Sequence, residues 1–304
     1  MAKRVKLILN PLANLGNAWK MAAKLRPIVD ELGGADWAGT VYPTHASELA
    51  HQAGLDGYDL VVAMGGDGTV HEVVNGLMEL PPEKRPLLGV VPLGSGNDFA
   101  YSMGIAEKAE DAMRQVFTGL PRSIDIGIFE DEHGRSQYWT NAVGIGFDAI
   151  VTIHSRSMPF LHGYPVYFAS VVKTIAFNYF PFKLSVMLDG QPWQQEAIML
   201  ILCNGKREGG GFHVAPDSSP FDGVFSYLSV RRISRLQMLN ALVHFMRGTQ
   251  FTLPYIQPGS FKQISLEADR PLVVHLDGEI VSGLNSQMRA IKASIVPAAL
   301  QAVV

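Results

Sequence analysis

The chain has 304 residues, of which 47% are hydrophobic and 17% are charged, and its formal net charge is −3. This length suggests two domains, and this composition excludes an intrinsically disordered chain. The slightly acidic charge gives no electrostatic basis for nucleic acid as a partner, and the single cysteine, Cys203, excludes an intramolecular disulfide.

The first residues carry no pattern typical of a secretory signal. The first apolar run is broken by Lys6 and ends at Asn10, whereas a signal needs a longer apolar core. The longest uncharged stretch, residues 157–172, contains prolines, a glycine and a histidine, and it is too short to span a bilayer. We therefore expect a soluble, cytoplasmic protein.

The first 122 residues alternate short apolar strands with amphipathic helices. The predicted strands are 5–9, 39–42, 60–64 and 87–91, and the predicted helices are 19–32, 47–53, 70–78, 98–103 and 107–117. Strands that are almost continuously apolar and alternate with helices are typical of a parallel sheet covered on both faces. We therefore expect an α/β domain over residues 1–122.

From residue 123 the pattern changes to strands separated by turn dipeptides such as Asp-Gly. The predicted strands are 123–129, 138–143, 183–188, 197–204, 225–230, 264–268, 272–276 and 288–296, and two helices are predicted at 164–179 and 235–246. Such runs indicate an antiparallel sheet or sandwich. We expect a β-rich acceptor domain over residues 123–304, whose last strand is able to pack back on the first domain. Cys203 ends an apolar run there, which indicates a buried, inert thiol.

A glycine-rich turn, Gly65-Gly66-Asp67-Gly68-Thr69, joins a predicted strand to a predicted helix. This arrangement directs free backbone N–H groups and the positive end of the helix dipole toward an anion, and glycine lets the backbone approach a phosphate closely. Thr69 is able either to cap the helix or to bind a phosphate oxygen. Asp67 would repel a phosphate unless Mg²⁺ lay between them, so we interpret it as a metal-side residue.

A second glycine turn, Leu93-Gly94-Ser95-Gly96-Asn97-Asp98, follows the next predicted strand, and Asn97 or Asp98 is the expected N-cap of the helix after it. By itself this is an ordinary capped turn. Two such turns after successive parallel strands fall at the same carboxyl edge of the sheet, where ligands of α/β folds bind. Their coincidence favours a nucleotide site.

The segment from Val62 to Leu77, with its Gly-Gly-Asp-Gly-Thr turn, resembles the catalytic domain of diacylglycerol kinases, sphingosine kinases and their soluble bacterial relatives. Residues 92–100, Pro-Leu-Gly-Ser-Gly-Asn-Asp-Phe-Ala, match the second motif of this family. Further matches lie at 10–11, 125–127, 141–148, 215–217, 222–223 and 277–279. The resemblance covers nearly the whole chain and implies the NAD kinase/diacylglycerol kinase-like fold, with a parallel α/β domain followed by an antiparallel β sandwich.

The resemblance also implies roles for particular residues. The residues that would face ATP are Asn10, Pro11, Asn14, Thr44, Gly65, Gly66, Asp67, Gly68, Thr69, Val70, His71, Glu72, Ser95 and Asn97. Those that would hold the catalytic Mg²⁺, partly through water, are Asp67, Asp98 and Asp125. A structural Mg²⁺ would bind the Ser219 and Val224 carbonyls and the Asp222 carboxylate. Glu279 would be the base that faces the acceptor hydroxyl, with Asp67 as the second catalytic residue.

Three of these carboxylates have an ordinary alternative role. On the residues alone, Glu279 would be a solvated hairpin carboxylate, Asp125 a residue at a strand end, and Asp222 part of an Asx-turn. The first loop also departs from the family, because Leu12-Ala13-Asn14 replaces the usual small residue and glycine. Asn14 tolerates the left-handed conformation, so the turn is expected to survive there.

On the acceptor side, apolar residues recur at helical spacing from Tyr164 to Tyr179, which indicates a helix that faces the core. The alternative is that its aromatic end, with residues 158–161, lines a cleft for acyl chains. Arg231, Arg232 and Arg235 could contact anionic headgroups, although three cations at a strand end are more often simply solvated.

The sequence thus predicts an ATP- and Mg²⁺-dependent kinase that phosphorylates a lipid alcohol such as diacylglycerol. It would contact a membrane surface transiently, and a homodimer stays open. Two alternatives remain: an NAD kinase-like phosphotransferase, which shares the first glycine turn, and a lipid-binding module without turnover.

Overall fold

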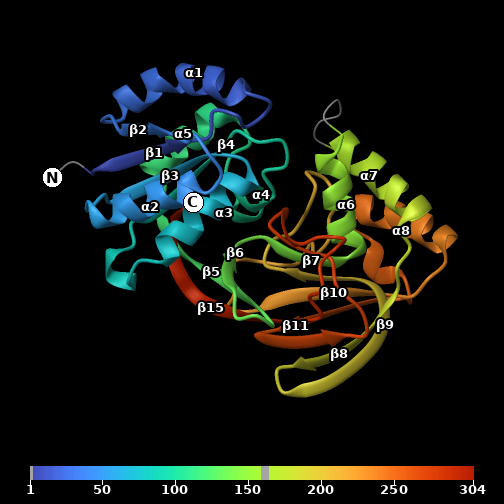
Figure 1. The fold of residues 1–304 in the computed structure, drawn as a ribbon. Helices are drawn as coiled ribbons and strands as arrows, with labels where there is room; N and C mark the ends of the chain where they lie inside the picture. The colour runs from blue at the N-terminus through green and yellow to red at the C-terminus, as the bar shows by residue number, and fades with distance from the viewer. Residues whose placement is uncertain (1–2, 159–163) are drawn as a thin grey trace. The chain divides into compact units, whose positions relative to one another are not determined.

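The computed structural model describes residues 3–158 and 164–304. It comprises two compact units (Figure 1): Met1–Ile126 together with Pro297–Val304 form the first, and Gly127–Val296 form the second. Two strands, β5 (Pro121–Asp131) and β15 (Ala290–Val303), have residues in both.

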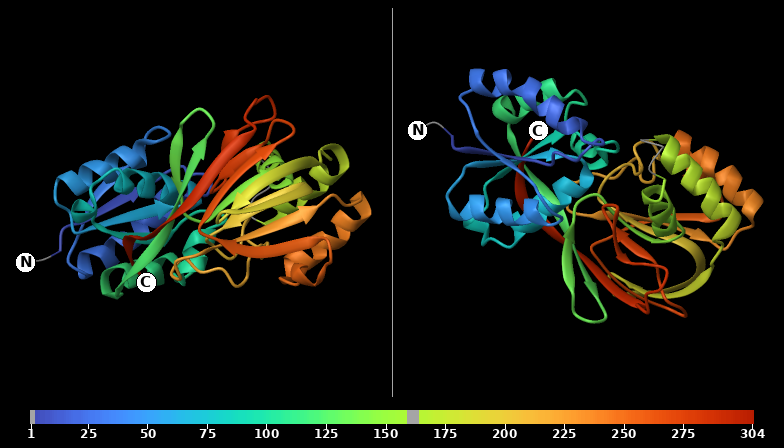
Figure 2. Two further views of the ribbon diagram at one scale, coloured as in Figure 1. Left: turned by 90° about the horizontal axis from the view of Figure 1, so that it is seen from below. Right: turned by 45° about the horizontal axis from the view of Figure 1, so that its top comes forward.

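The first unit contains a parallel sheet in the order β2-β1-β3-β4, with the end of β15 beside β4. Its other strands are β1 (Val5–Leu9), β2 (Asp36–Gly39), β3 (Leu60–Gly65) and β4 (Leu87–Pro92), and its helices are α1 (Asn17–Glu31), α2 (His45–Leu55), α3 (Asp67–Met78), α4 (Asp98–Met103), α5 (Ala109–Thr118) and the short η1 (Pro82–Lys84). Helices α1 and α5 lie on one side of the sheet and α2 and α3 on the other (Figures 1 and 2). This double cover explains why β3 is buried at every residue.

The second unit is built on antiparallel strands, in the order β14-β13-β7-β9-β8-β12-β15, with β10 between β9 and β11. Its strands, apart from the shared two, are β6 (Ser136–Trp139), β7 (Ala142–Gly146), β8 (Phe182–Leu188), β9 (Gln191–Cys203), β10 (Phe225–Arg231), β11 (Ile256–Phe261), β12 (Gln263–Ala268), β13 (Val274–Leu276) and β14 (Glu279–Ser282). Its helices are α6 (Phe147–Arg156), α7 (Tyr164–Phe177), α8 (Arg235–Arg247) and the short η2 (Gln250–Thr252).

Strand β9 separates two hydrophobic cores in the second unit. Leu200 and Leu202 belong to the first core, which contains Trp139 and other side chains of the strands. Met199, Ile201 and Cys203 alternate with them and belong to the second core, together with residues of α7 and α8. The period of two in the side chains of a strand explains this alternation. Cys203 is fully buried, as predicted.

The predicted fold class is confirmed, while several elements differ from prediction. The second strand of the parallel sheet lies at Asp36–Gly39 instead of 39–42, and the apolar side chains of Val41 and Tyr42 are exposed. The strand predicted at 138–143 is two strands, interrupted at Thr140 and Asn141. Helix α6 and strands β11 and β14 were not predicted at all. Among the described residues, no helix combines the length and the apolar character needed to cross a membrane.

Candidate active site

The first glycine turn lies between β3 and α3. The helix begins at Asp67, three residues earlier than predicted, and its N-cap is Gly66 in an extended conformation. Thr69 is therefore inside the helix and does not cap it; its Oγ1 accepts a hydrogen bond of 3.2 Å from Asn10 Nδ2. A Cβ at Gly65 would overlap the Thr69 side chain, so this close packing requires glycine.

The second glycine turn packs directly against the first. Leu93 N donates to Gly65 O at 2.8 Å, and a Cβ built on Gly66 would lie 3.2 Å from Gly94 Cα. Asn97 occupies the N-cap position of α4, but its side chain turns back and bonds both the N–H and the C=O of Gly94, each at 3.0 Å. The turn is thus held rigid by its own amide side chain.

The carboxylates of Asp67 and Asp98 converge on the second turn. A Cβ at Gly96 would lie 2.9 Å from Asp67 Oδ2 and 3.2 Å from Asp98 Oδ2, so glycine lets both carboxylates approach the backbone of this turn. The other oxygen of Asp67 accepts the N–H of Phe99 at 3.1 Å, which ties α3 to the first turn of α4. Two carboxylates beside one glycine are a donor set that suits Mg²⁺, which prefers oxygen ligands.

Asp125 is buried, and its Oδ1 accepts the N–H of Ala298 at 2.8 Å. In the part of the chain that the structure describes, Asp67, Asp98 and Asp125 do not form a group whose carboxylate oxygens all lie within 4.8 Å of one another. Binding of one ion by all three therefore stays a prediction, and it requires bridging water.

The remaining residues predicted to face ATP divide by exposure. Those at least partly exposed are Asn10, Pro11, Asn14, Thr44, Gly66, Gly68, Glu72, Ser95 and Asn97, and those buried are Gly65, Thr69, Val70 and His71. Asn14 has the left-handed conformation that the sequence suggested, with φ of 50°. The Glu72 carboxylate accepts hydrogen bonds from the backbone N–H groups of Thr44 and Ala46, at 2.9 and 3.1 Å. It thereby provides acceptors for N–H groups at the start of α2 that have no partner within the helix.

In the second unit, Glu279 follows a tight hairpin between β13 and β14. Asp277 and Gly278 have φ of 51° and 87°, the pair of positive values that a two-residue type I′ turn requires. Glu279 Oε1 lies 2.6 Å from Arg156 Nη2 at the end of α6, and the side chains are 44% and 49% exposed. The carboxylate is thus both accessible and held in one orientation.

Asp277 fixes this hairpin to the segment between β6 and β7. Its buried carboxylate accepts four hydrogen bonds: from Thr140 N at 2.8 Å, Thr140 Oγ1 at 3.1 Å, Asn141 N at 2.7 Å and Ala142 N at 3.1 Å. Three of these donors are backbone N–H groups at the point where β6 ends and β7 begins, and the fourth is the Thr140 hydroxyl. The interruption of the predicted strand 138–143 therefore has a physical cause, because its N–H groups bind a carboxylate instead of a neighbouring strand.

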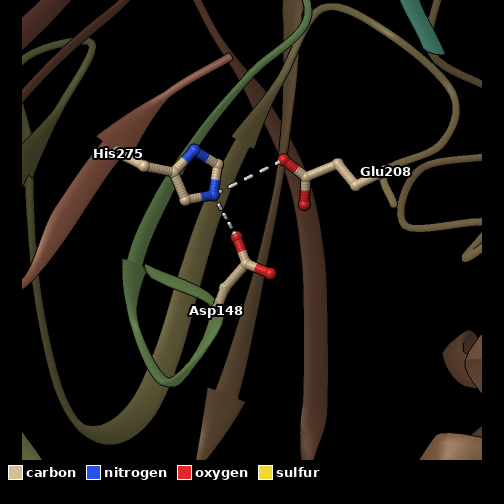
Figure 3. Close-up of side chains that lie close together, drawn as sticks. All are labelled: Asp148, Glu208 and His275. Carbon is tan, nitrogen blue, oxygen red and sulfur yellow. Dashed lines mark hydrogen bonds and ion pairs between the residues drawn. The ribbon is translucent and has the colours of Figure 1, made fainter. Parts of the chain in front are cut away.

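His275 provides a second anchor (Figure 3). Its Nδ1 accepts the N–H of Gly278 at 3.1 Å, while its Nε2 lies 2.7 Å from Asp148 Oδ2 and 3.8 Å from Glu208 Oε1. A ring nitrogen that accepts carries no proton, so the proton of the neutral ring is on Nε2 and points at Asp148. The three side chains are close enough to share a metal ion, which would have to displace the Nε2 proton. With that proton in place they form a hydrogen-bonded support for the hairpin.

Sequence reasoning missed most of this support. Asp148 lay at the end of the 141–148 match, but His275, Glu208 and Thr140 were not singled out. They come from segments far apart in the chain, and no periodicity links them. The one usable signal was that a histidine stands two residues before the Asp-Gly of the hairpin.

At the predicted structural metal site, Asp222 is exposed and its Oδ1 accepts the N–H of Val224 at 3.2 Å, which is the Asx-turn considered as the alternative. Ser219 is partly buried. A Mg²⁺ ion at these residues stays a prediction.

The predicted acyl-chain cleft is only partly described. Pro159, Phe160 and Leu161 lie outside the described residues, as does the side chain of Tyr164. The expectation that the apolar residues of α7 share one buried face is wrong for Phe168 and Val172, which are 39% and 41% exposed, although Ile175 is buried.

The chain is similar to known lipid kinases in sequence. Residues 4–129 match the model of the diacylglycerol kinase catalytic domain, and residues 141–304 match that of the YegS C-terminal NAD kinase beta sandwich-like domain. A diacylglycerol kinase from Bacillus subtilis (strain 168) is 31% identical over 281 residues, which cover 91% of this chain and 90% of the relative. A "Probable lipid kinase YegS-like" from Chromohalobacter salexigens is 33% identical over 234 residues, 76% of this chain and 73% of the relative. The resemblance inferred from the motifs is thereby confirmed.

Solved structures agree on the fold. The crystal structure of a diacylglycerol kinase from Bacillus anthracis str. Sterne superposes on 99% of this chain and on 96% of the solved chain. The TM-score is 0.73 and the sequence identity is 20%. A second crystal structure from the same organism gives a TM-score of 0.80 at 23% identity, with 99% and 95% coverage.

Proposed function

The chain belongs to the diacylglycerol kinase catalytic-domain family, and from this premise we propose that it is an ATP-dependent lipid kinase. It would transfer the γ-phosphate of ATP to the hydroxyl of a lipid such as diacylglycerol. The names of two relatives, a diacylglycerol kinase and a probable lipid kinase, support a lipid as the acceptor.

The observation that carries the proposal is the pair of packed glycine turns with two carboxylates directed at Gly96. Phosphoryl transfer needs positioning and charge stabilisation more than covalent chemistry. The N–H groups at the start of α3 would bind phosphate oxygens, and the Asn10–Thr69 bond would hold the first loop beside them.

The carboxylates of Asp67 and Asp98 fit a Mg²⁺ ion, and Asp125 would reach it through water. The ion would supply positive charge that offsets the charge of the phosphate groups. Asp67 would also hold the start of α4 against the start of α3 through its bond to Phe99 N. The Ser219, Asp222 and Val224 site would hold a second, structural Mg²⁺.

Glu279 would orient the acceptor hydroxyl and take its proton late in the transfer, because an alcohol is a weak acid and the transition state is loose. Its ion pair with Arg156 keeps the carboxylate pointed in one direction. The turn beneath it is fixed by Asp277 and His275, so the base would need little reorganisation when substrate binds.

A direct assay tests the proposal. The purified chain is incubated with γ-labelled ATP and Mg²⁺ and with one of three acceptors: diacylglycerol in detergent, a total lipid extract, or NAD. We expect label in a lipid and none in NAD. Label in NAD alone would establish the NAD kinase alternative, and lipid binding without release of ADP would establish a module without turnover.

Within this assay, Asp67→Asn is the decisive variant. Loss of the carboxylate charge should reduce lipid phosphorylation by at least about a hundredfold, because charge stabilisation supplies most of the acceleration. Asp30→Asn, an exposed carboxylate on α1, is the matched control and should keep the wild-type rate. Full activity of Asp67→Asn would contradict the assigned role.

A further inference from the structure

Helix α8 carries an apolar stripe on its exposed face. Leu236 is 79% exposed, Leu239 and Val243 are each 43% exposed, and Met246 is 39% exposed. Their spacing of three, four and three residues puts them on one side of the helix. The opposite side, with Met238, Ala241 and Leu242, is buried. An ordinary surface helix presents polar residues to water, so α8 has an outer face that its own fold does not use.

Helix α7 adds to this apolar surface. The two helices lie side by side in Figures 1 and 2, and Arg235 Nε at the start of α8 donates to Ile175 O in α7 at 2.9 Å. Phe168 and Val172 of α7 are partly exposed. Phe177, the last residue of α7, is 75% exposed, and Phe180, three residues after the helix, is 50% exposed. We call the exposed apolar residues of both helices and of the segment just after α7 the α7–α8 surface: Phe168, Val172, Phe177, Phe180, Leu236, Leu239, Val243 and Met246.

The two helices carry cations and no acidic residues. Lys173 lies in α7, and Arg235 and Arg247 lie at the two ends of α8. Glu196 of β9 pairs with Arg232 at 3.1 Å. The molecule is acidic as a whole and cationic here.

We propose that the α7–α8 surface docks the protein reversibly on bilayers that contain anionic phospholipid. This inference extends the proposed function and rests on it in one respect: a kinase in water has to reach a lipid substrate. Apolar side chains on one helix face enter the boundary of headgroups and acyl chains, and Lys and Arg beside them contact the phosphates. A second copy of the chain is the poorer occupant, because a two-fold interface would set cation against cation.

The test uses the full-length protein and sedimentation with vesicles. One vesicle set is phosphatidylcholine alone, and the other is an equimolar mixture with phosphatidylglycerol. Wild type should bind the mixed vesicles and bind phosphatidylcholine weakly. Leu236→Glu/Leu239→Glu should weaken binding to mixed vesicles by at least about tenfold, because burying one leucine contributes about that factor. Leu55→Glu, an exposed leucine on α2, is the matched control.

Two further readouts separate this proposal from neighbouring explanations. The double variant should phosphorylate diacylglycerol dispersed in detergent at the wild-type rate, which excludes misfolding. If no variant or wild-type sample phosphorylates lipid, the proposed function fails while the vesicle result still decides the docking surface. Vesicle binding unchanged in the double variant would overturn the proposal, as would light scattering that shows a wild-type dimer split by these substitutions.

Discussion

Glu279 combines accessibility with a fixed orientation, since Arg156 holds its carboxylate at 2.6 Å. If it orients the acceptor hydroxyl and accepts its proton, Glu279→Gln should lower kcat by about a hundredfold to ten-thousandfold, the usual contribution of a general base. ATP binding should be unchanged, because the substitution does not touch the phosphate turns. Initial rates together with calorimetric titration of ATP check both statements.

A suitable control is Glu267→Gln, an exposed carboxylate on β12 in the same unit. Its rate should match wild type. Arg156→Gln should give an intermediate loss, because it frees Glu279 without removing it. Wild-type kcat in Glu279→Gln would leave the base unidentified.

Asp277 contributes to stability instead of chemistry. An asparagine in its place has one acceptor oxygen, and its NH₂ group would face donors such as Asn141 N. Hydrogen bonds to a buried carboxylate are worth about 1.5–3 kcal/mol each, so Asp277→Asn should lower the free energy of unfolding by about 2–4 kcal/mol. Urea denaturation measures this loss, and Glu130→Gln, exposed on β5, should leave the midpoint unchanged.

At the scale of elements, the sequence predicted best where the hydrophobic pattern alone decides. Strands β3 and β4 were predicted to within one residue, since their apolar runs are continuous and both faces are covered. Strand β2 was misplaced because Asp36–Gly39 is a poor strand sequence that forms through its pairing with β1. Strand β11 contains Pro258 and Gly259, which usually argue against a strand, and it pairs through β10 alone.

The candidate site residues likewise divide into those that the sequence predicted and those that it did not. Local motifs pointed to the glycine turns, Asp67 and Asp98, because the required backbone geometry is encoded within a few residues. The support beneath Glu279 could not be predicted, because Asp148, Glu208 and His275 meet only after three strands and a helix have paired.

The reactivity of Cys203 measures whether the second unit is folded, because β9 places this side chain inside the second hydrophobic core. Burial raises the pKa of its thiol well above the ordinary value, and the nearby Glu208 and Asp148 carboxylates raise it further. The thiolate is the reactive form, so the folded protein should react very slowly with iodoacetamide at mildly alkaline pH. Mass spectrometry should find Cys203 unmodified in buffer and fully alkylated in denaturant. Rapid labelling in buffer would mean that this part of the sheet opens.

At the scale of the whole molecule, the final residues complete the first unit. Beyond Pro297 the chain belongs to that unit, where Ala302 is opposite Leu88 of β4. Leu120 and Val304 exchange two backbone hydrogen bonds, of 3.2 and 3.1 Å. Leu300, Ala302 and Val303 are buried. The first unit therefore depends on residues that are separated from the rest of it in the sequence by the whole second unit.

This dependence predicts that a charge at Ala302 unfolds the first unit selectively. Ala302 is fully buried, so Ala302→Glu would place a carboxylate in the apolar interior at a cost of several kcal/mol. The neighbouring Gln301→Glu, whose side chain is exposed, should be tolerated and serves as the control. Limited proteolysis should cut Ala302→Glu within residues 1–126, with ATP binding lost, while Cys203 in the second unit stays protected from alkylation. Equal loss of Cys203 protection would instead mean that both units unfold as one cooperative structure.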